Sequence, residues 1–403
     1  MVLYLDYVTL DVFTSSAFKG NPLAVVFLPR LSSERVTRDQ MQAIAREFNF
    51  SETIFVYPVS PMTPSKRRID IFMTTKELPF AGHPTIGAAS WLLRLSPCRE
   101  EQAELKALTT KAGDIPISQM AASSLVSASI PHEFHLHKTR FPLSELLRLH
   151  PTLGQFLQTN EFEKDSFPVF SVVKGMTVIP VELPSINALG AIDMPTGGET
   201  IKTLSALNGG YLDAGWDGEG LINLYFYVRD VPDGGKTVLR TRMLLGNFED
   251  PATGSSATGL AAYLSLFSQQ PADNLVFDYE IVQGVEMGRK SNIGVHVVLC
   301  RDKKGIEEVK LIGGAVQEIN IEDWRPECLD NPTAASSASI SLIIICREHE
   351  AIQNPTANGQ PLGTAIQSAK SSFLCLLERP PSSDVGEVFG VMSNQKWSIW
   401  QPK

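Results

Sequence analysis

Three ionisable side chains lie beside turns, where side chains commonly point into a cleft. Glu52 lies between an expected helix and an expected strand, in the run NFSETIFV, and His83 and Asp250 each lie next to a glycine turn. Two carboxylates and an imidazole can accept, hold and return a proton, so these residues are candidates for general acid–base chemistry. We expect a neutral ring at His83, because the dipole of the helix that begins there disfavours imidazolium. The alternative for each residue is a structural role as a solvated carboxylate or a helix cap.

Two distant segments share one pattern. GHPTIGAASWL begins at Gly82 and GSSATGLAAYL begins at Gly254, with both glycines, an alanine, an aromatic residue and a leucine in register. Such a repeat predicts two pseudo-symmetric halves, each with a glycine turn that leads into a small-residue helix. If the two helix N-termini converge, their free N–H groups would bind an anion such as a substrate carboxylate. Two ordinary, tightly packed helix starts are the alternative.

The elements that must position these residues follow from patterning. Residues 37–48 are the clearest helix, because Thr37 and Gln40 can form a capping box and apolar residues recur at helical spacing. The repeat helices are expected at 83–93 and 255–267. We expect strands at 2–13, 23–28, 53–57, 68–73, 274–281 and 294–300. Mostly antiparallel strands around one central helix in each half indicate an α+β fold.

Bulk properties limit the class of protein. A chain of 403 residues is long enough for two domains with separate cores, which we place at 1–123 and 124–324. A net charge of −9 argues against nucleic-acid and anionic-membrane partners. No apolar run reaches the roughly 20 residues that span a bilayer, and the start does not resemble a signal peptide. Five cysteines without CxxC spacing fit free thiols and a cytoplasmic location.

The composition changes after Trp324. Residues 325–403 contain Ser/Ala/Thr-rich stretches and proline breaks. Within them, the apolar run 340–346 is too short to span a membrane and resembles an unpaired, aggregation-prone strand. We therefore expect a weakly ordered or peripheral tail at 325–403.

Five runs taken together resemble the phenazine-biosynthesis PhzF-like family. In chain order they are GNPLAVV, NFSETIFV, ELPFAGHPTIGAA, EDPATGSSATGLAAYL and IVQGVEMGR, and the resemblance covers about residues 5–320. It implies the diaminopimelate-epimerase fold, in which two similar domains each wrap a β-sheet around a central helix. The active site of that fold lies between the domains.

The resemblance also implies roles for individual residues. Glu52 matches the family's catalytic acid/base, which shifts a proton on a small cyclic acid, and His83 and Asp250 match its polar partners. The helix-start positions that hold the substrate are matched by Gly82, Gly254 and Ser255. A carboxylate as close as Asp250 would raise the pKa of Glu52 toward the operating pH. The resemblance implies no metal and no organic cofactor.

Two local features bear on these assignments. Before the second glycine turn the family usually has Arg-x-Phe-x-Pro-x-x-Gly, whereas residues 242–246 read RMLLG, about three residues shorter and without the proline. This difference is expected to reshape one wall of the substrate pocket.

A second histidine cluster, His132, His135 and His137, is explained more simply by alternation along a strand than by metal binding.

The expected function is a cofactor-independent isomerase of secondary metabolism that acts on a small cyclic, carboxylate-bearing metabolite. The resemblance also favours a homodimer. No cysteine lies in either glycine turn, so the two-thiol racemase mechanism of the fold's epimerase branch is not expected. Two alternatives stay open. One is a non-catalytic binding or regulatory protein of this family, and the other is an epimerase or racemase with a second acid/base on the opposite face.

Overall fold

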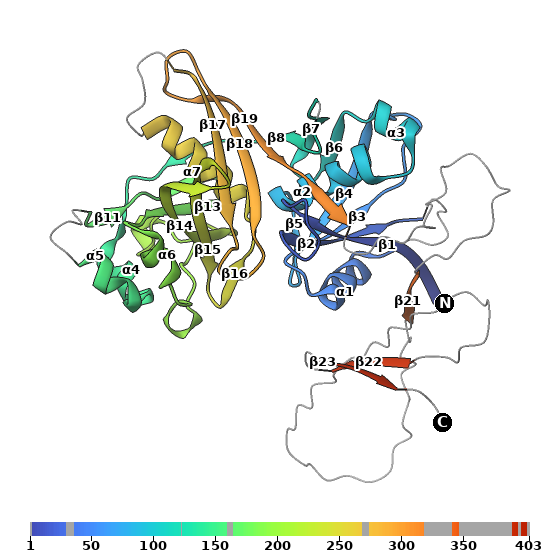
Figure 1. Cartoon of the computed structure of the whole chain (residues 1–403), viewed down its shortest axis with the longest axis horizontal. Helices are drawn as coiled ribbons and strands as arrows, with labels where there is room; N and C mark the ends of the chain where they lie inside the picture. The colour runs from blue at the N-terminus through green and yellow to red at the C-terminus, as the bar shows by residue number, and fades with distance from the viewer. Residues whose placement is uncertain are drawn as a thin grey trace, which may run out of the picture.

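The computed structural model describes residues 2–29, 36–121, 123–158, 164–267 and 274–317, together with short strands at 341–345, 389–393 and 396–400. Figure 1 shows two lobes, one mostly blue to cyan and the other mostly green to orange, with β19 (Ile306–Gly313, orange) running from the second lobe toward the first. The first and second halves of the chain therefore form separate lobes of strands and helices, as the internal repeat predicted. No helix in the described residues is long and apolar enough to cross a membrane.

The N-terminal half is a mixed sheet wrapped around helix α2 (Gly82–Ser90), whose nine residues are all buried. Helix α1 (Arg38–Phe48) covers the sheet, and its N-cap residue Thr37 forms the predicted capping box with Gln40. A π-helical turn (Trp91–Leu95) and α3 (Arg99–Glu104) follow α2. The strands are β1 (Val2–Val12), β2 (Asn21–Phe27), β3 (Thr53–Val56), β4 (Lys66–Phe72), β5 (Glu77–Leu78), β6 (Ala107–Thr110) and β7 (Gly113–Gln119).

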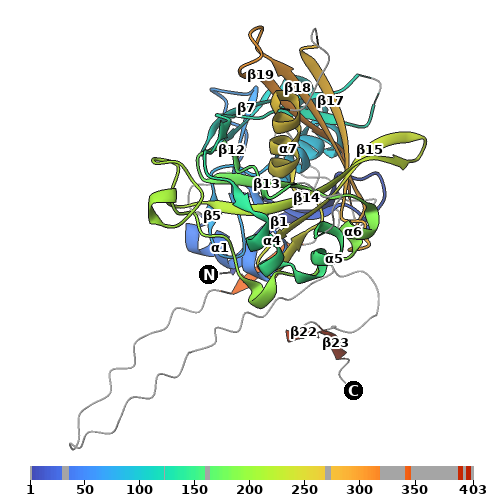
Figure 2. The same ribbon diagram turned by 90° about the vertical axis from the view of Figure 1, so that its left-hand side faces the viewer.

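The C-terminal half repeats this arrangement around helix α7 (Gly254–Phe267), and Figure 2 shows α7 running through the surrounding strands. A helix that is apolar on every side, as α7 is, must be enclosed by its neighbours. The main strands are β12 (Phe170–Val173), β13 (Met176–Glu182), β14 (Leu221–Asp233), β15 (Lys236–Leu245), β16 (Phe248–Asp250), β17 (Val276–Gln283), β18 (Ser291–Leu299) and β19 (Ile306–Gly313). Shorter elements are β8 (Val126–Ser129), β9 (His135–Leu136), β10 (Phe141–Pro142), α4 (Leu143–Leu149), α5 (Gly154–Leu157), β11 (Ser166–Phe167) and α6 (Ile186–Gly190).

The repeated glycines have two different structural roles. At Gly87 and Gly259, the second glycine of each copy, a Cβ atom would overlap side chains of the surrounding sheet, at Leu23 and Val178 respectively. These glycines let a central helix pack closely against its strands. The first glycines face each other instead, because a Cβ on Gly82 would lie 2.9 Å from the Cα of Gly254. The two helix starts therefore meet, which the repeat by itself had left open.

Strands from both ends of the second half connect the two lobes. β8 pairs with β7 and with β19, and β20 (Ala315–Gln317) returns to the first half, where it pairs with β1.

Part of the predicted tail also joins the sheet. Strand β21 (Ser341–Ile345), which lies within the apolar run 340–346, pairs antiparallel with residues 2–6 of β1, so the expectation of an unpaired strand is wrong. The hairpin of β22 (Phe389–Ser393) and β23 (Lys396–Trp400) is separate, and the rest of 325–403 lies outside the described residues.

Candidate active site

Glu52 and His83 are brought together at the boundary between the halves. Helix α1 is followed by its C-cap residue Asn49, whose left-handed backbone (φ 53°) turns the chain toward β3. Glu52 is the residue immediately before β3. His83 is the second residue of α2. Its Nδ1 atom lies 3.1 Å from Glu52 Oε2, and the side chains are only 3% and 14% exposed. The sequence predicted this pairing only through the family resemblance, since the two residues share no local pattern.

Asp250 enters the same site from the other half. It is the last residue of β16 and is 6% exposed. Its Oδ1 atom accepts a hydrogen bond from Asn21 Nδ2 (2.7 Å), and its Oδ2 atom accepts one from Thr253 Oγ1 (2.6 Å). Asn21 belongs to the N-terminal half and also donates to the carbonyl oxygen of Ala252 (3.0 Å). This asparagine therefore ties the two halves together at the site.

The sequence analysis missed Asn21 as a site residue. It lies in the run GNPLAVV, where Gly20-Asn21-Pro22 suggested only a turn. An asparagine in a turn normally hydrogen-bonds its own backbone, so its reach across to Asp250 could not be inferred from the local sequence. The signal that could have revealed it is the presence of this run among the family-like segments.

The two carboxylates have opposite pKa shifts. Burial by itself would raise the pKa of Glu52, but the electrostatic interaction with His83 and hydrogen bonds from His83 and Ser51 outweigh it, so the pKa is lowered. Burial, together with the Glu52 charge, raises the pKa of Asp250 to about 7. The expectation that Asp250 would raise the pKa of Glu52 is therefore wrong. His83 stabilises the Glu52 anion, and Asp250 becomes the group that retains a proton.

A buried nitrogen beside this pair points to a polar ligand. His83 Nε2 is buried and has no hydrogen-bond partner among the described residues. Buried polar atoms in proteins are nearly always paired, so an unpaired one needs an explanation. This nitrogen is on the ring that contacts Glu52, and a hydrogen-bonding substrate at the site would supply its partner.

The predicted substrate-holding positions lie at the two helix starts. Gly82 and Gly254 are buried and in backbone contact, whereas Ser255 is half-buried and its hydroxyl makes no hydrogen bond within the described residues. No side chain caps the start of α2, and neither helix has an acidic residue in its first turn. The positive ends of both dipoles therefore lie close together, and neither helix supplies an acidic residue of its own first turn to neutralise them.

The shortened segment 242–246 leads directly into Asp250. Gly246 and Asn247 form a two-residue turn between β15 and β16, in which Leu245 pairs with Phe248 and Gly246 has the left-handed φ of 57°. Arg242 is buried and pairs with Glu249 through two hydrogen bonds of 2.7 and 2.8 Å. The missing residues are therefore accommodated by a tight hairpin, whose last residue is Asp250.

The second histidine cluster is a hydrogen-bonded group remote in sequence from the site. His135 and His137 lie on the same side of the chain, as alternation predicts, and Asp213 joins them from a distant loop. Asp213 Oδ2 is 2.8 Å from His135 Nε2, and the backbone N–H of Asp213 donates to His137 Nδ1 (2.9 Å). His137 Nε2 is 2.8 Å from Ser171 Oγ, and burial together with His135 lowers the pKa of His137 to about 4.

His135, His137 and Asp213 each have one potential ligand atom within 4.8 Å of the other two, a spacing that a metal ion could use. However, His137 Nδ1 already accepts a hydrogen bond from the backbone N–H of Asp213. A metal ion would have to replace that hydrogen bond. His132 is not part of the group, because its ring stacks on Phe134 at 4.9 Å.

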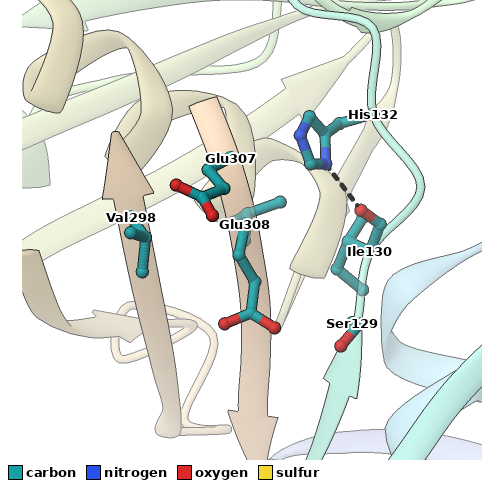
Figure 3. Close-up of a pocket in the computed structure, with 7 residues that line it drawn as sticks. Ser129, Ile130, His132, Val298, Glu307 and Glu308 are labelled. Atoms are coloured by element: carbon teal, nitrogen blue, oxygen red, sulfur yellow. Dashed lines mark hydrogen bonds between the residues drawn. The ribbon is translucent and has the colours of Figure 1, made fainter. Parts of the chain in front are cut away.

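A hollow of about 430 Å³ lies elsewhere on the surface, between β8, β18 and β19. Figure 3 shows Glu307 and Glu308 on one side of it and His132, bonded to the carbonyl oxygen of Ile130, on the other. Glu308 accepts a hydrogen bond from Lys310 Nζ (2.7 Å). The hollow shares no lining residue with the Glu52–His83–Asp250 group, so it does not define the reaction centre.

Comparison with known proteins relates the chain to one family. The model of the family described as phenazine biosynthesis-like protein matches residues 10–203 and 223–320. An uncharacterized isomerase of Mesorhizobium japonicum is 32% identical over 319 residues, which are 77% of this chain and 96% of that protein. The trans-2,3-dihydro-3-hydroxyanthranilate isomerase of Pseudomonas aeruginosa is 29% identical over 316 residues, 77% of this chain and 97% of that protein.

Solved structures support the same fold. The phenazine biosynthesis protein of Bacillus anthracis, of the PhzF family, has a TM-score of 0.58 at 18% identity and covers 79% of this chain and 97% of its own. A predicted epimerase of Pseudomonas aeruginosa has a TM-score of 0.51 at 24% identity, covering 78% and 96%. The expected α+β fold with two epimerase-like halves is thus confirmed, and the chain belongs to the phenazine biosynthesis-like (PhzF) family.

Proposed function

We propose that this protein is a cofactor-independent isomerase that moves a proton on a small cyclic, carboxylate-bearing metabolite, with Glu52 as the acid/base. The observation that supports it best is the pairing of Glu52 with His83 beside a buried, proton-retaining Asp250. Two carboxylates whose pKa values are pushed apart by their surroundings are suited to act as a base and an acid at the same pH.

In the proposed reaction the Glu52 carboxylate accepts a proton from an acidic carbon of the substrate. The electron pair left on that carbon delocalises toward an oxygen, where the helix starts at Gly82 and Gly254 and a proton-bearing Asp250 stabilise the charge. His83 holds Glu52 in place, and Ser255 can bind the substrate carboxylate. Glu52 then returns the proton to a different carbon on the same face. No atoms or electrons are gained or lost, so the product is an isomer.

The test compares wild type with Glu52→Gln in D2O. The first probe is trans-2,3-dihydro-3-hydroxyanthranilate, the compound named in the P. aeruginosa relative. NMR follows both rearrangement and deuterium uptake. Glu101→Gln is the matched control, because Glu101 is a largely buried carboxylate of the same half that pairs with Arg67 instead of lying at the site. We expect activity in wild type and the control and none in Glu52→Gln. Equal activity in all three would exclude Glu52 as the acid/base.

An epimerase is the second candidate, because Asp250 provides the second proton-transfer group that such a reaction needs. With a chiral substrate, inversion of a stereocentre with deuterium incorporation in the product would favour epimerisation over isomerisation. Loss of that inversion in both Glu52→Gln and Asp250→Asn would indicate a two-base mechanism. From the family resemblance we also propose that the protein is a homodimer and that it acts in secondary metabolism. Light scattering of the purified chain tests the dimer.

A further inference from the structure

A buried polar network lies directly behind Asp250, and Gln283 is at its centre. Gln283 is the last residue of β17 and is 0% exposed. Its Nε2 atom donates to the carbonyl oxygen of Asp250 (2.7 Å) and to Thr253 Oγ1 (3.0 Å). Its Oε1 atom accepts from the backbone N–H of Thr253 (3.2 Å) and from Tyr225 OH (2.9 Å). These four bonds use the full capacity of one amide.

The direction of the Gln283 amide is fixed by its partners. The backbone nitrogen of Thr253 can only donate, so Oε1 must face it. The backbone oxygen of Asp250 can only accept, so Nε2 must face that side. Tyr225 OH adds a second donor to Oε1 and itself accepts from Thr241 Oγ1 (3.1 Å). A rotated amide would lose the bonds to both backbone groups.

The fixed amide determines the direction of the next hydroxyl. Thr253 Oγ1 accepts a hydrogen from Gln283, so its own hydrogen is left for Asp250 Oδ2, 2.6 Å away. The other carboxylate oxygen, Oδ1, is held by Asn21. Both oxygens of Asp250 thus receive a donor, and the donor on Oδ2 depends on Gln283.

We propose that Gln283 is a positioning residue for Asp250, because it directs the Thr253 hydroxyl toward Oδ2 and so sets how readily Asp250 takes up a proton. The meaning of this for catalysis rests on the proposed function. The structural claim does not, since it concerns the protonation of a carboxylate in the free protein.

The other groups that act on Asp250 set the direction of the expected change. Burial and the negative charge of Glu52 raise its pKa, whereas His83 and the hydrogen bonds from Thr253 and Asn21 lower it. Its neighbour Glu249 is occupied with Arg242. Removing the directing amide weakens the Thr253 bond, which favours the anion, so the pKa of Asp250 should rise further.

The experiment measures the titration of Asp250 by carbon-13 NMR of protein with labelled Asp carboxyl groups, and Asp250→Asn assigns the signal. In Gln283→Met we expect the midpoint to rise by about one pH unit, a tenfold gain in proton affinity. Thr253→Val should give a similar rise. The double variant should show little more than either single change, because both act through one hydroxyl. If Gln283→Met does not fold, Gln283→Leu takes its place, since its side chain is also neutral and cannot donate to Asp250 or Thr253.

Two controls separate positioning from general disturbance of the core. Tyr225→Phe removes a bond to Gln283 but leaves the amide held by two backbone groups, so the Asp250 midpoint should stay near the wild-type value. Ser265→Ala removes a buried hydroxyl near the other end of α7, bonded to Ala261 and Tyr279, and should also leave it unchanged. An unchanged midpoint in the folded Gln283 variant, or an equal rise in Tyr225→Phe, would overturn the proposal. Neither result depends on turnover, so a failure of the proposed isomerase activity would be seen separately.

Discussion

Replacing Gly82 by alanine tests whether the contact between the two helix starts holds the site together. The added Cβ would lie 2.9 and 3.0 Å from the Cα and carbonyl carbon of Gly254, and 3.0 Å from Leu311 Cδ2. An ordinary contact needs at least 3.4 Å, so the backbones of the two halves must separate by about half an ångström. Because two backbones cannot yield as a rotating side chain does, we expect a loss of about 1–3 kcal/mol, the usual cost of overpacking.

The expected fall in melting temperature is about 3–10 °C, and calorimetry measures it. Gly254→Ala should cost less, since its closest contact, 2.7 Å, is with the side chain of Leu311. Gly190→Ala is the matched control, because a Cβ there meets no atom within 4 Å, and it should be neutral or slightly stabilising. Separation of the helix starts should also lower turnover by roughly 10–100-fold. A Gly82→Ala protein as stable as Gly190→Ala would refute the contact.

Three further predictions concern other parts of the molecule. The pKa of Asp250 in the folded protein, about 7, is above its unfolded value, so the stability that Asp250 contributes is present at low pH and lost as pH rises. Denaturant unfolding from pH 4 to 8 should show wild type losing stability relative to Asp250→Asn. A constant difference between the two proteins would contradict the shift. A chain that ends at residue 326 should melt within about 3 °C of the full chain, because the pairing of β21 recorded among the described residues is with residues 2–6 of β1, and the family match ends at 320. A larger loss would give the tail a structural role. Added Zn²⁺ should not raise the melting temperature, because the Asp213 amide occupies His137 Nδ1; a rise that His135→Ala removes would identify a metal site.

Much of the local structure was predictable, because it depends on neighbours in the chain. The helix that begins at Thr37 could be predicted because a capping box and an apolar stripe are both local patterns. The repeated glycines predicted two halves but left open whether their helix starts converge, and the structure shows that they are in contact. The strand 341–345 was taken as unpaired because its partner, β1, lies at the opposite end of the chain.

The chemistry of the site was only partly predictable. The sequence by itself determined which residues were candidates, because Glu52, His83 and Asp250 occur in runs that resemble one family. Only the tertiary structure decided which carboxylate retains a proton. A pKa depends on burial and on charges within a few ångströms, and these come from both halves of the chain. His83 lies against Glu52, whereas Asp250 is enclosed with Asn21, Thr253 and Gln283. The raised pKa that we expected at Glu52 is therefore found at Asp250 instead.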